Sequence, residues 1–225
     1  MYNTLPKQFY LHKDCVNRKA KSGLIKVSFL LSTFFFVLFF SHQLFAQNTT
    51  VLSESFDGGF PPTGWTNTAA GSGLNWARVT SSTYPSGISP RSGSGLLRLN
   101  CFSVSSGTAT LISSSFSLAA RGTNNAIVSV WVYRENGYST DNDSISVRIN
   151  TSSSVTGATY LGFVSRSRSL APVVATDGLY KYDFNLPGSF NTGTNYLIIE
   201  GTSKYGNDIH IDDASCTILG PMIYS

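Results

Sequence analysis

Apolar and polar residues alternate along much of the chain after residue 46. The clearest example is 144–150, where Ile145, Val147 and Ile149 alternate with polar residues. A period of two is typical of a β-strand with one buried and one exposed face. No segment after residue 46 shows a convincing period of 3.6 residues, so the pattern predicts an all-β protein.

Short turn motifs such as PPTG, YPSG, ENG and YGND separate the alternating segments. The segment 126–134 carries apolar residues on both faces, so we expect it near the centre of its sheet. Short strands at this spacing favour a two-sheet β-sandwich with a single core. Ten strands are expected: 51–56, 75–80, 94–102, 108–118, 126–134, 144–150, 159–164, 179–185, 195–203 and 209–218.

The first 46 residues differ in composition from the rest of the chain. Six of the 16 Lys and Arg residues precede Val27, and the apolar run VSFLLSTFFFVLFF and the motif SHQLFAQ follow them. This order is typical of a signal peptide that is cleaved, here after Ala46. The alternative is an uncleaved membrane anchor, but the apolar run is short for a span of about 20 residues. We therefore expect a secreted protein with a signal peptide over 1–46, one domain over 47–219 and a C-terminal tail over 220–225.

Removing this leader changes the charge of the protein. The whole chain has a formal net charge of +4, whereas the part after the leader holds 10 Lys and Arg against 11 Asp and Glu. Its largest basic group is the pair Arg166 and Arg168. Binding to nucleic acid requires a broader positive surface, so we expect no nucleic-acid partner.

Two acidic stretches lie at opposite ends of the expected domain. In the late one, GNDIHIDDASCTI, the alternation ends where Asp212 and Asp213 are adjacent, and adjacent carboxylates repel each other unless a positive group holds them. The early one, ESFDGGFPPTGW, supplies Glu54 and Asp57. If the first and last strands are neighbours, these carboxylates could jointly hold a cation such as Ca²⁺, which takes about six to eight oxygen ligands.

Six short motifs follow one another across nearly all of the expected domain: ESFDGGFPPTGW, Trp76, GTATLISSSFSL, VSVWVYR, DSISVRIN and NDIHIDDAS. In this order they resemble the MAM-like jelly roll of the cleaved-adhesin and choice-of-anchor J families. The resemblance implies an extracellular jelly-roll module, usually attached to larger secreted or surface proteins, that often carries a structural calcium ion. By position, Glu54 and Asp213 match the family's early and final acidic residues, and the further candidate ligands are Asp57, Asp143 and Asp212.

Two cysteines, Cys101 and Cys216, follow the leader. In an oxidising compartment a disulfide between them would close a long loop and stabilise the fold. Two buried free thiols are the alternative, because a bridge requires Cα atoms within about 7 Å and the sequence does not give that distance.

The aromatic residues divide into core and surface candidates. Trp65 follows a turn and Trp131 lies in the strand with two apolar faces, so we expect both in the core. Tyr138 and Tyr205 each stand beside a glycine in an expected loop, where binding residues concentrate. These two tyrosines are the better candidates to contact a ligand, which would be an extracellular glycan or a host or matrix protein.

Catalytic motifs are scarce after the leader. His210 is the one histidine there, and no GxSxG nucleophile motif occurs. A glycosidase would need two carboxylates across a cleft, and Glu200 is the most enclosed of three glutamates. We therefore expect a non-enzymatic adhesion or ligand-binding module. The alternatives are a carbohydrate-active enzyme that uses Glu200 and a structural fragment of a larger surface protein.

Overall fold

The computed structural model describes residues 47–220, and in this part the chain forms strands joined by loops and two short 3₁₀ helices. The predicted signal peptide over 1–46 and most of the predicted tail lie outside the described residues. Within 47–220, no helix is long and apolar enough to cross a membrane. The elements are β1 (Thr49–Glu54), β2 (Thr66–Thr68), β3 (Trp76–Val79), β4 (Leu96–Leu99), η1 (Cys101–Ser103), β5 (Gly107–Ile112), η2 (Ala119–Arg121), β6 (Ala126–Arg134), β7 (Ser144–Asn150), β8 (Thr159–Ser165), β9 (Gly178–Asn185), β10 (Tyr196–Ser203) and β11 (Ile209–Ile218).

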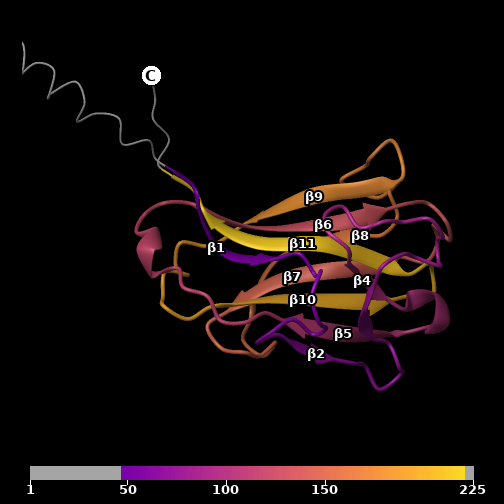
Figure 1. Ribbon diagram of the computed structural model, residues 1–225, viewed down its shortest axis with the longest axis horizontal. Coiled ribbons are helices and arrows are strands. Elements are labelled where there is room, and N and C mark those ends of the chain that lie inside the picture. The colour runs from indigo at the N-terminus through magenta and orange to yellow at the C-terminus, as the bar shows by residue number, and fades with distance from the viewer. Residues whose placement is uncertain (1–46, 221–225) are drawn as a thin grey trace, which may run out of the picture. The chain divides into compact units, whose positions relative to one another are not determined.

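The strands form two sheets that pack face to face, so the predicted all-β sandwich is confirmed (Figure 1). The first sheet has the order β3-β4-β11-β6-β9, with β1 also paired to β11, and the second has the order β2-β5-β10-β7-β8. β4 and β1 share one edge of β11, because β4 pairs with 209–211 and β1 with 214–218. The first and last strands are therefore neighbours, as a site shared between them requires.

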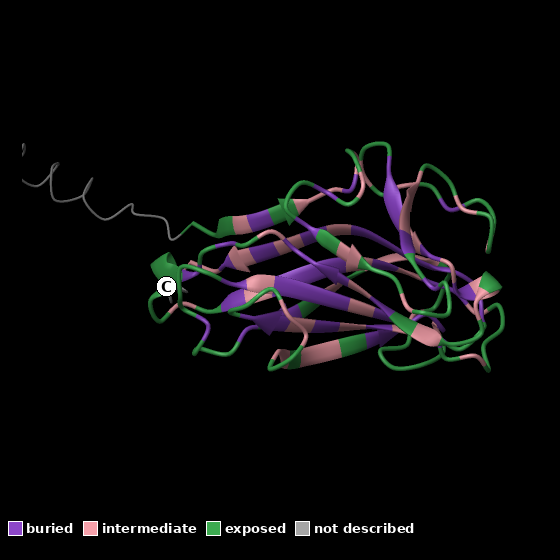
Figure 2. Cartoon of the chain, turned by 90° about the horizontal axis from the view of Figure 1, so that it is seen from below, coloured by how far each residue is buried: buried purple, intermediate pink, exposed green. Residues whose placement is uncertain are grey.

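The core lies between the two sheets and consists of alternate residues from each strand (Figure 2). Ile145, Val147 and Ile149 are fully buried, as their alternation predicts, and burial of each such side chain contributes about 1.5–3 kcal/mol. Trp76 is also fully buried, and its indole N–H donates to the Ala109 carbonyl oxygen at 3.2 Å. Gly201 gives this indole room, since a Cβ there would lie 2.7 Å from the ring.

All ten predicted strands are present, and the sequence does not predict the short β2. β2 pairs with β5, but its three residues, TNT, are all polar, so the sequence contains no alternation of apolar and polar residues at this strand. β5 ends at Ile112 rather than at residue 118. The physical reason is Ser113, whose hydroxyl oxygen accepts the Leu197 amide at 2.9 Å in place of a backbone carbonyl and so ends the regular ladder.

Of the two alternatives for Cys101 and Cys216, a disulfide or two buried free thiols, the structure has the second. Cys101 lies against the Ile209 backbone at the start of β11, and Cys216 lies seven residues further along that strand. Seven strand residues span about 23 Å, which a disulfide cannot bridge. Burial raises the pKa of both thiols to about 12, so neither is a reactive thiolate.

Candidate functional site

A bulge in β11 sets the positions of the two adjacent aspartates. The pairing with β6 shifts register between Asp212 and Ala214, which leaves Asp213 as an extra residue with a left-handed φ of 43°. Glu54, at the end of β1, pairs with Ala214 directly beside this bulge. Glu54, Asp212 and Asp213, from both ends of the described chain, therefore lie along the side of β11 where β4 ends and β1 begins, and Asp57 follows three residues after Glu54. We call Glu54, Asp57, Asp212 and Asp213 the acidic edge.

Three carboxylates of the acidic edge bind one loop segment, 91–95. Asp212 accepts the Arg91 amide at 2.7 Å, and Asp213 accepts the Ser92 hydroxyl at 2.8 Å and forms an ion pair with the Arg91 guanidinium. Asp57 accepts the backbone amides of Ser94 and Gly95. The three carboxylates therefore fix this loop segment against the first sheet.

Glu54 stays within its own turn, where its side chain accepts the Phe56 amide at 2.8 Å. Gly93 permits the approach of Asp57, because a Cβ at Gly93 would collide with that carboxylate. The amide of Ser94 is the main cause that lowers the pKa of Asp57. Asp57 is thus held in its ionised form by hydrogen bonds from the loop.

The chemistry of the acidic edge suits a hard cation, but its geometry is arranged around N–H donors. Burial raises the pKa of Asp212, and the neighbouring charge of Asp213 adds to this rise. A cation beside Asp212 and Asp213 would lower the pKa of Asp212 again. Carboxylate oxygens are also ligands that Ca²⁺ prefers. Within 47–220, however, no three His, Cys, Asp or Glu side chains converge closely enough to surround an ion. A calcium ion would have to displace Arg91 and the loop amides.

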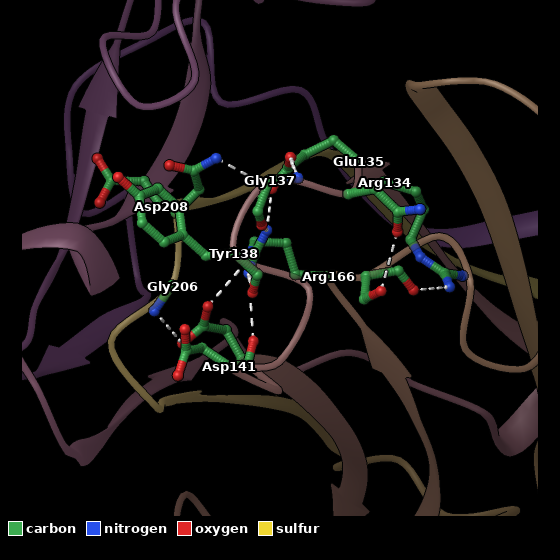
Figure 3. A network of polar contacts seen from close by, with 12 residues as sticks. Arg134, Glu135, Gly137, Tyr138, Asp141, Arg166, Gly206 and Asp208 are labelled. Carbon is green, nitrogen blue, oxygen red and sulfur yellow. Dashed lines mark hydrogen bonds and ion pairs between the residues drawn. The ribbon is translucent and has the colours of Figure 1, made fainter.

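Asp143 does not join the acidic edge. It is fully buried beside Arg166, whose Nε lies 2.8 Å from Asp143 Oδ2, and Arg166 also forms an ion pair with Glu135. Figure 3 shows the guanidinium of Arg166 among the loops that follow β6 and β10. The five predicted metal ligands therefore separate into four at the acidic edge and one in this ion network.

The side chain of Arg166 binds backbone carbonyl oxygens of the loop 135–143. Its guanidinium donates to the carbonyl oxygens of Gly137 at 2.6 Å, Tyr138 at 2.9 Å and Asp141 at 3.2 Å (Figure 3). Burial lowers the pKa of Arg166 to about 10, so the side chain remains charged at neutral pH. One buried cation thus donates to three loop carbonyl oxygens, two of which, those of Tyr138 and Asp141, also accept backbone amides of the same loop.

Asp143 holds the neighbouring loop, 204–208. Its Oδ1 accepts the amides of Lys204 at 2.6 Å and Gly206 at 3.3 Å. Gly206 has to be glycine for this approach, because a Cβ there would collide with Asp143 and with Arg166. The ion pair between Asp143 and Arg166 therefore connects two loops that are far apart in sequence.

These two loops carry the tyrosines that the sequence analysis selects. Tyr138 is 55% exposed and Tyr205 is 58% exposed, and both have left-handed backbones, with φ of 49° and 78°. Such conformations cost about 1–3 kcal/mol for residues other than glycine and persist where surrounding structure enforces them. The hydrogen bonds of Arg166 and Asp143 supply that structure, so both side chains point outward from fixed backbones.

Two further aromatic residues lie beside Tyr138. Phe102 stacks on Tyr84 with ring centroids 3.8 Å apart, and it packs edge-to-face with Tyr138 with ring centroids 5.9 Å apart. Asp208 connects their loops, since its carboxylate accepts the Phe102 amide at 2.9 Å and its amide donates to the Tyr84 carbonyl oxygen at 3.0 Å. Tyr205 lies on the loop 204–208, which contains Asp208 and which the ion pair between Asp143 and Arg166 connects to the loop of Tyr138. We call these contacting side chains Tyr84, Phe102 and Tyr138, together with Tyr205 on that loop, the aromatic cluster. Sequence alone offers no signal that brings Tyr84 and Phe102 to the loop of Tyr138.

The residues of the enzymatic alternative are occupied or enclosed. The Glu200 carboxylate lies 2.5 Å from Arg148 Nε on the outer face of the second sheet. His210 is fully buried, and its two ring nitrogens have no hydrogen-bond partner among the described residues. Burial lowers the pKa of His210 to about 3. Neither side chain presents a free acid or base to solvent.

No family model and no curated protein matches the sequence. Among solved structures, the K1 cleaved adhesin domain of Lys-gingipain from Porphyromonas gingivalis W83 is similar, with a TM-score of 0.55 and 19% identity over 76% of this chain and 100% of that one. The K3 cleaved adhesin domain of the same protein gives a TM-score of 0.52 and 20% identity over 76% and 99%. A cyclase from Fischerella sp. TAU gives 0.51 and 10% identity over 79% and 100%. The chain therefore has the jelly-roll β-sandwich fold that the sequence predicts, in the form found in cleaved adhesin domains.

Proposed function

We propose that this chain is a secreted, non-catalytic adhesion module that binds an extracellular protein through its aromatic cluster. The observation that carries the proposal is the pair of exposed tyrosines, Tyr138 and Tyr205, on loops that one buried ion pair holds in place. Tyrosine buries a large area at low cost in side-chain entropy and is enriched at the energetic centres of protein interfaces. A preformed backbone lowers the ordering cost of binding further.

The similar fold of the gingipain cleaved adhesin domains supports an adhesion role for this chain, within the MAM-like and choice-of-anchor J group that its motifs resemble. Calcium is part of the same proposal. Glu54, Asp57, Asp212 and Asp213 would hold one Ca²⁺ together with carbonyl oxygens of nearby loops, and the ion would connect β1 to β11. The position of Glu54, Asp212 and Asp213 beside one bulge supports this role.

An array of extracellular matrix proteins tests the proposed function. We expect the purified protein to capture at least one of them, and Tyr138→Ser and Tyr205→Ser each to weaken capture at least tenfold, as loss of an interface anchor does. Lys181→Ser is the control, because Lys181 is exposed on β9, outside these loops. Full capture by both Tyr138→Ser and Tyr205→Ser, or no capture by the parent protein, would show that the aromatic cluster is not a protein-binding site.

A further inference from the structure

The edge strand β8 exposes two aromatic rings on one face. Tyr160 is 51% exposed and Phe163 is 52% exposed. Residues three apart in a regular strand point to opposite faces of the sheet. Here the register with β7 shifts, so that Val147 pairs with Gly162 but Arg148 pairs with Tyr160. Leu161 is the extra residue of this bulge, and both rings consequently point to the outer face of the second sheet.

Bulges of this kind redirect side chains and are conspicuous beside functional sites. Gly162 fixes the position of the bulge, because the Phe184 ring of the first sheet occupies the space of its missing Cβ, at 2.8 Å. Leu161 packs against the core. The inward side of β8 is thus anchored, while its two aromatic rings remain in solvent.

The strand register aligns these rings with polar partners in two cross-strand rows. In the first row, Tyr160 of β8 pairs with Arg148 of β7. In the second row, two residues along β7, the paired residues on successive strands are Phe163 (β8), Ser146 (β7), Glu200 (β10) and Thr110 (β5). The rows are about 7 Å apart, the length of two strand residues. Arg148 connects the rows, since its guanidinium lies 5.4 Å from the Tyr160 ring and its Nε lies 2.5 Å from the Glu200 carboxylate.

The charge of this face identifies the kind of ligand that it suits. Its one cation and one anion, Arg148 and Glu200, neutralise each other and are only partly exposed, at 30% and 15% of their side chains. A nucleic acid or an acidic polymer would require an uncompensated positive surface. A neutral sugar chain instead needs apolar rings for its C–H faces and a mixture of donors and acceptors for its hydroxyl groups. Arg148, Glu200, Ser146 and Thr110 supply that mixture beside Tyr160 and Phe163.

We propose that the outer face of the second sheet is a binding site for a neutral oligosaccharide, with Tyr160 and Phe163 as stacking platforms and the Arg148–Glu200 pair as the polar contact for sugar hydroxyls. This site is separate from the aromatic cluster, which lies in the loops around Arg166. The two proposed binding sites can therefore be tested independently.

Titration of the purified protein with cellohexaose, xylohexaose and mannohexaose, followed by amide NMR shifts, tests the proposal. We expect at least one of the three to shift resonances of β7, β8 and β10. Tyr160→Ala and Phe163→Ala should each raise its Kd about tenfold or more, which is the range for loss of one stacking platform. Tyr160→Phe keeps the ring and should retain most of the affinity. Val173→Ala is the control for loss of exposed apolar surface, since Val173 is 70% exposed in the loop after β8.

Three results would overturn this assignment. One is that none of the three hexasaccharides binds at millimolar concentration. Another is that binding occurs but is lost in Tyr138→Ser and unchanged in Phe163→Ala, which would place the sugar on the aromatic cluster. The third is self-association in sedimentation that Phe163→Ala abolishes, which would assign the face to a second copy of this chain.

Discussion

Arg166 Nε and Asp143 Oδ2 lie 2.8 Å apart, and both side chains are almost completely removed from solvent. Arg166 binds the backbone of one loop, and Asp143 binds the backbone of another. This single pair therefore determines how Tyr138 and Tyr205 are presented together. Buried ion pairs add little net stability compared with apolar packing, but removal of one partner leaves an uncompensated charge.

Arg166→Met should destabilise the protein strongly, because Asp143 and Glu135 would both remain buried without their cation. We expect the free energy of unfolding, measured by urea denaturation, to fall by about 3–5 kcal/mol. Arg168→Met is the matched control. Its pair with Asp177 is exposed at the surface, and such pairs contribute about 0–1 kcal/mol. Equal effects of the two substitutions would show that the buried network does not stabilise the loops.

Gly206→Ala tests the close approach of the loop to the ion pair. The new Cβ would collide with the carboxylate of Asp143, and the fold can relieve this only by moving the loop. We expect a loss of about 1–3 kcal/mol in unfolding free energy, the usual cost of overpacking, and faster amide exchange at Tyr205. Gly188→Ala is the control, because no atom lies within 4 Å of a Cβ at that position. Unchanged exchange at Tyr205 in Gly206→Ala would contradict this account.

The local pattern in the sequence predicts the strands well, because the alternation depends only on which residues of each strand face the core. The same local reasoning places Tyr138 and Tyr205 in exposed loops. The pairing of β1 with β11 is the condition that a cation site shared by the two ends requires, and the structure meets it. The bulges at Asp213 and Leu161 could not be predicted, since a register shift depends on both partner strands. Contacts across the fold, such as Arg166 with Asp143, likewise leave no mark in either local segment. Side-chain pairs of this kind decide what each end of the sandwich presents to solvent.

Calcium should stabilise the protein if the acidic edge holds the ion. At a free concentration 100 times its Kd the ion would add about 2.7 kcal/mol, which corresponds to a rise in Tm of roughly 5–10 °C for a domain of this size. EDTA should remove this rise, and added calcium should restore it, in differential scanning calorimetry. Asp212→Asn should abolish the response, whereas Asp177→Asn, an exposed carboxylate outside the acidic edge, should retain it. A Tm that neither EDTA nor calcium changes would exclude the calcium site.

His210 should make the fold sensitive to acid. Burial and the nearby charge of Arg98 lower its pKa from 6.5 to about 3, so the unfolded chain binds a proton between these values that the folded chain does not. Stability from this group is therefore complete above about pH 6.5 and is lost as the pH falls towards 3. The expected loss between pH 7 and pH 5 is about 2 kcal/mol.

His210→Leu removes the titrating group and the two unpaired ring nitrogens while it keeps an apolar side chain of similar size. We expect urea denaturation of this variant to show a smaller decrease in stability between pH 7 and pH 5 than the parent protein shows. Asp208 and Asp212, whose pKa values burial raises, act in the opposite direction below neutral pH and are common to both proteins, so they cancel in the comparison. Parallel pH profiles for the two proteins would mean that the pKa of His210 is nearly the same in the folded and unfolded chains, which would contradict this account.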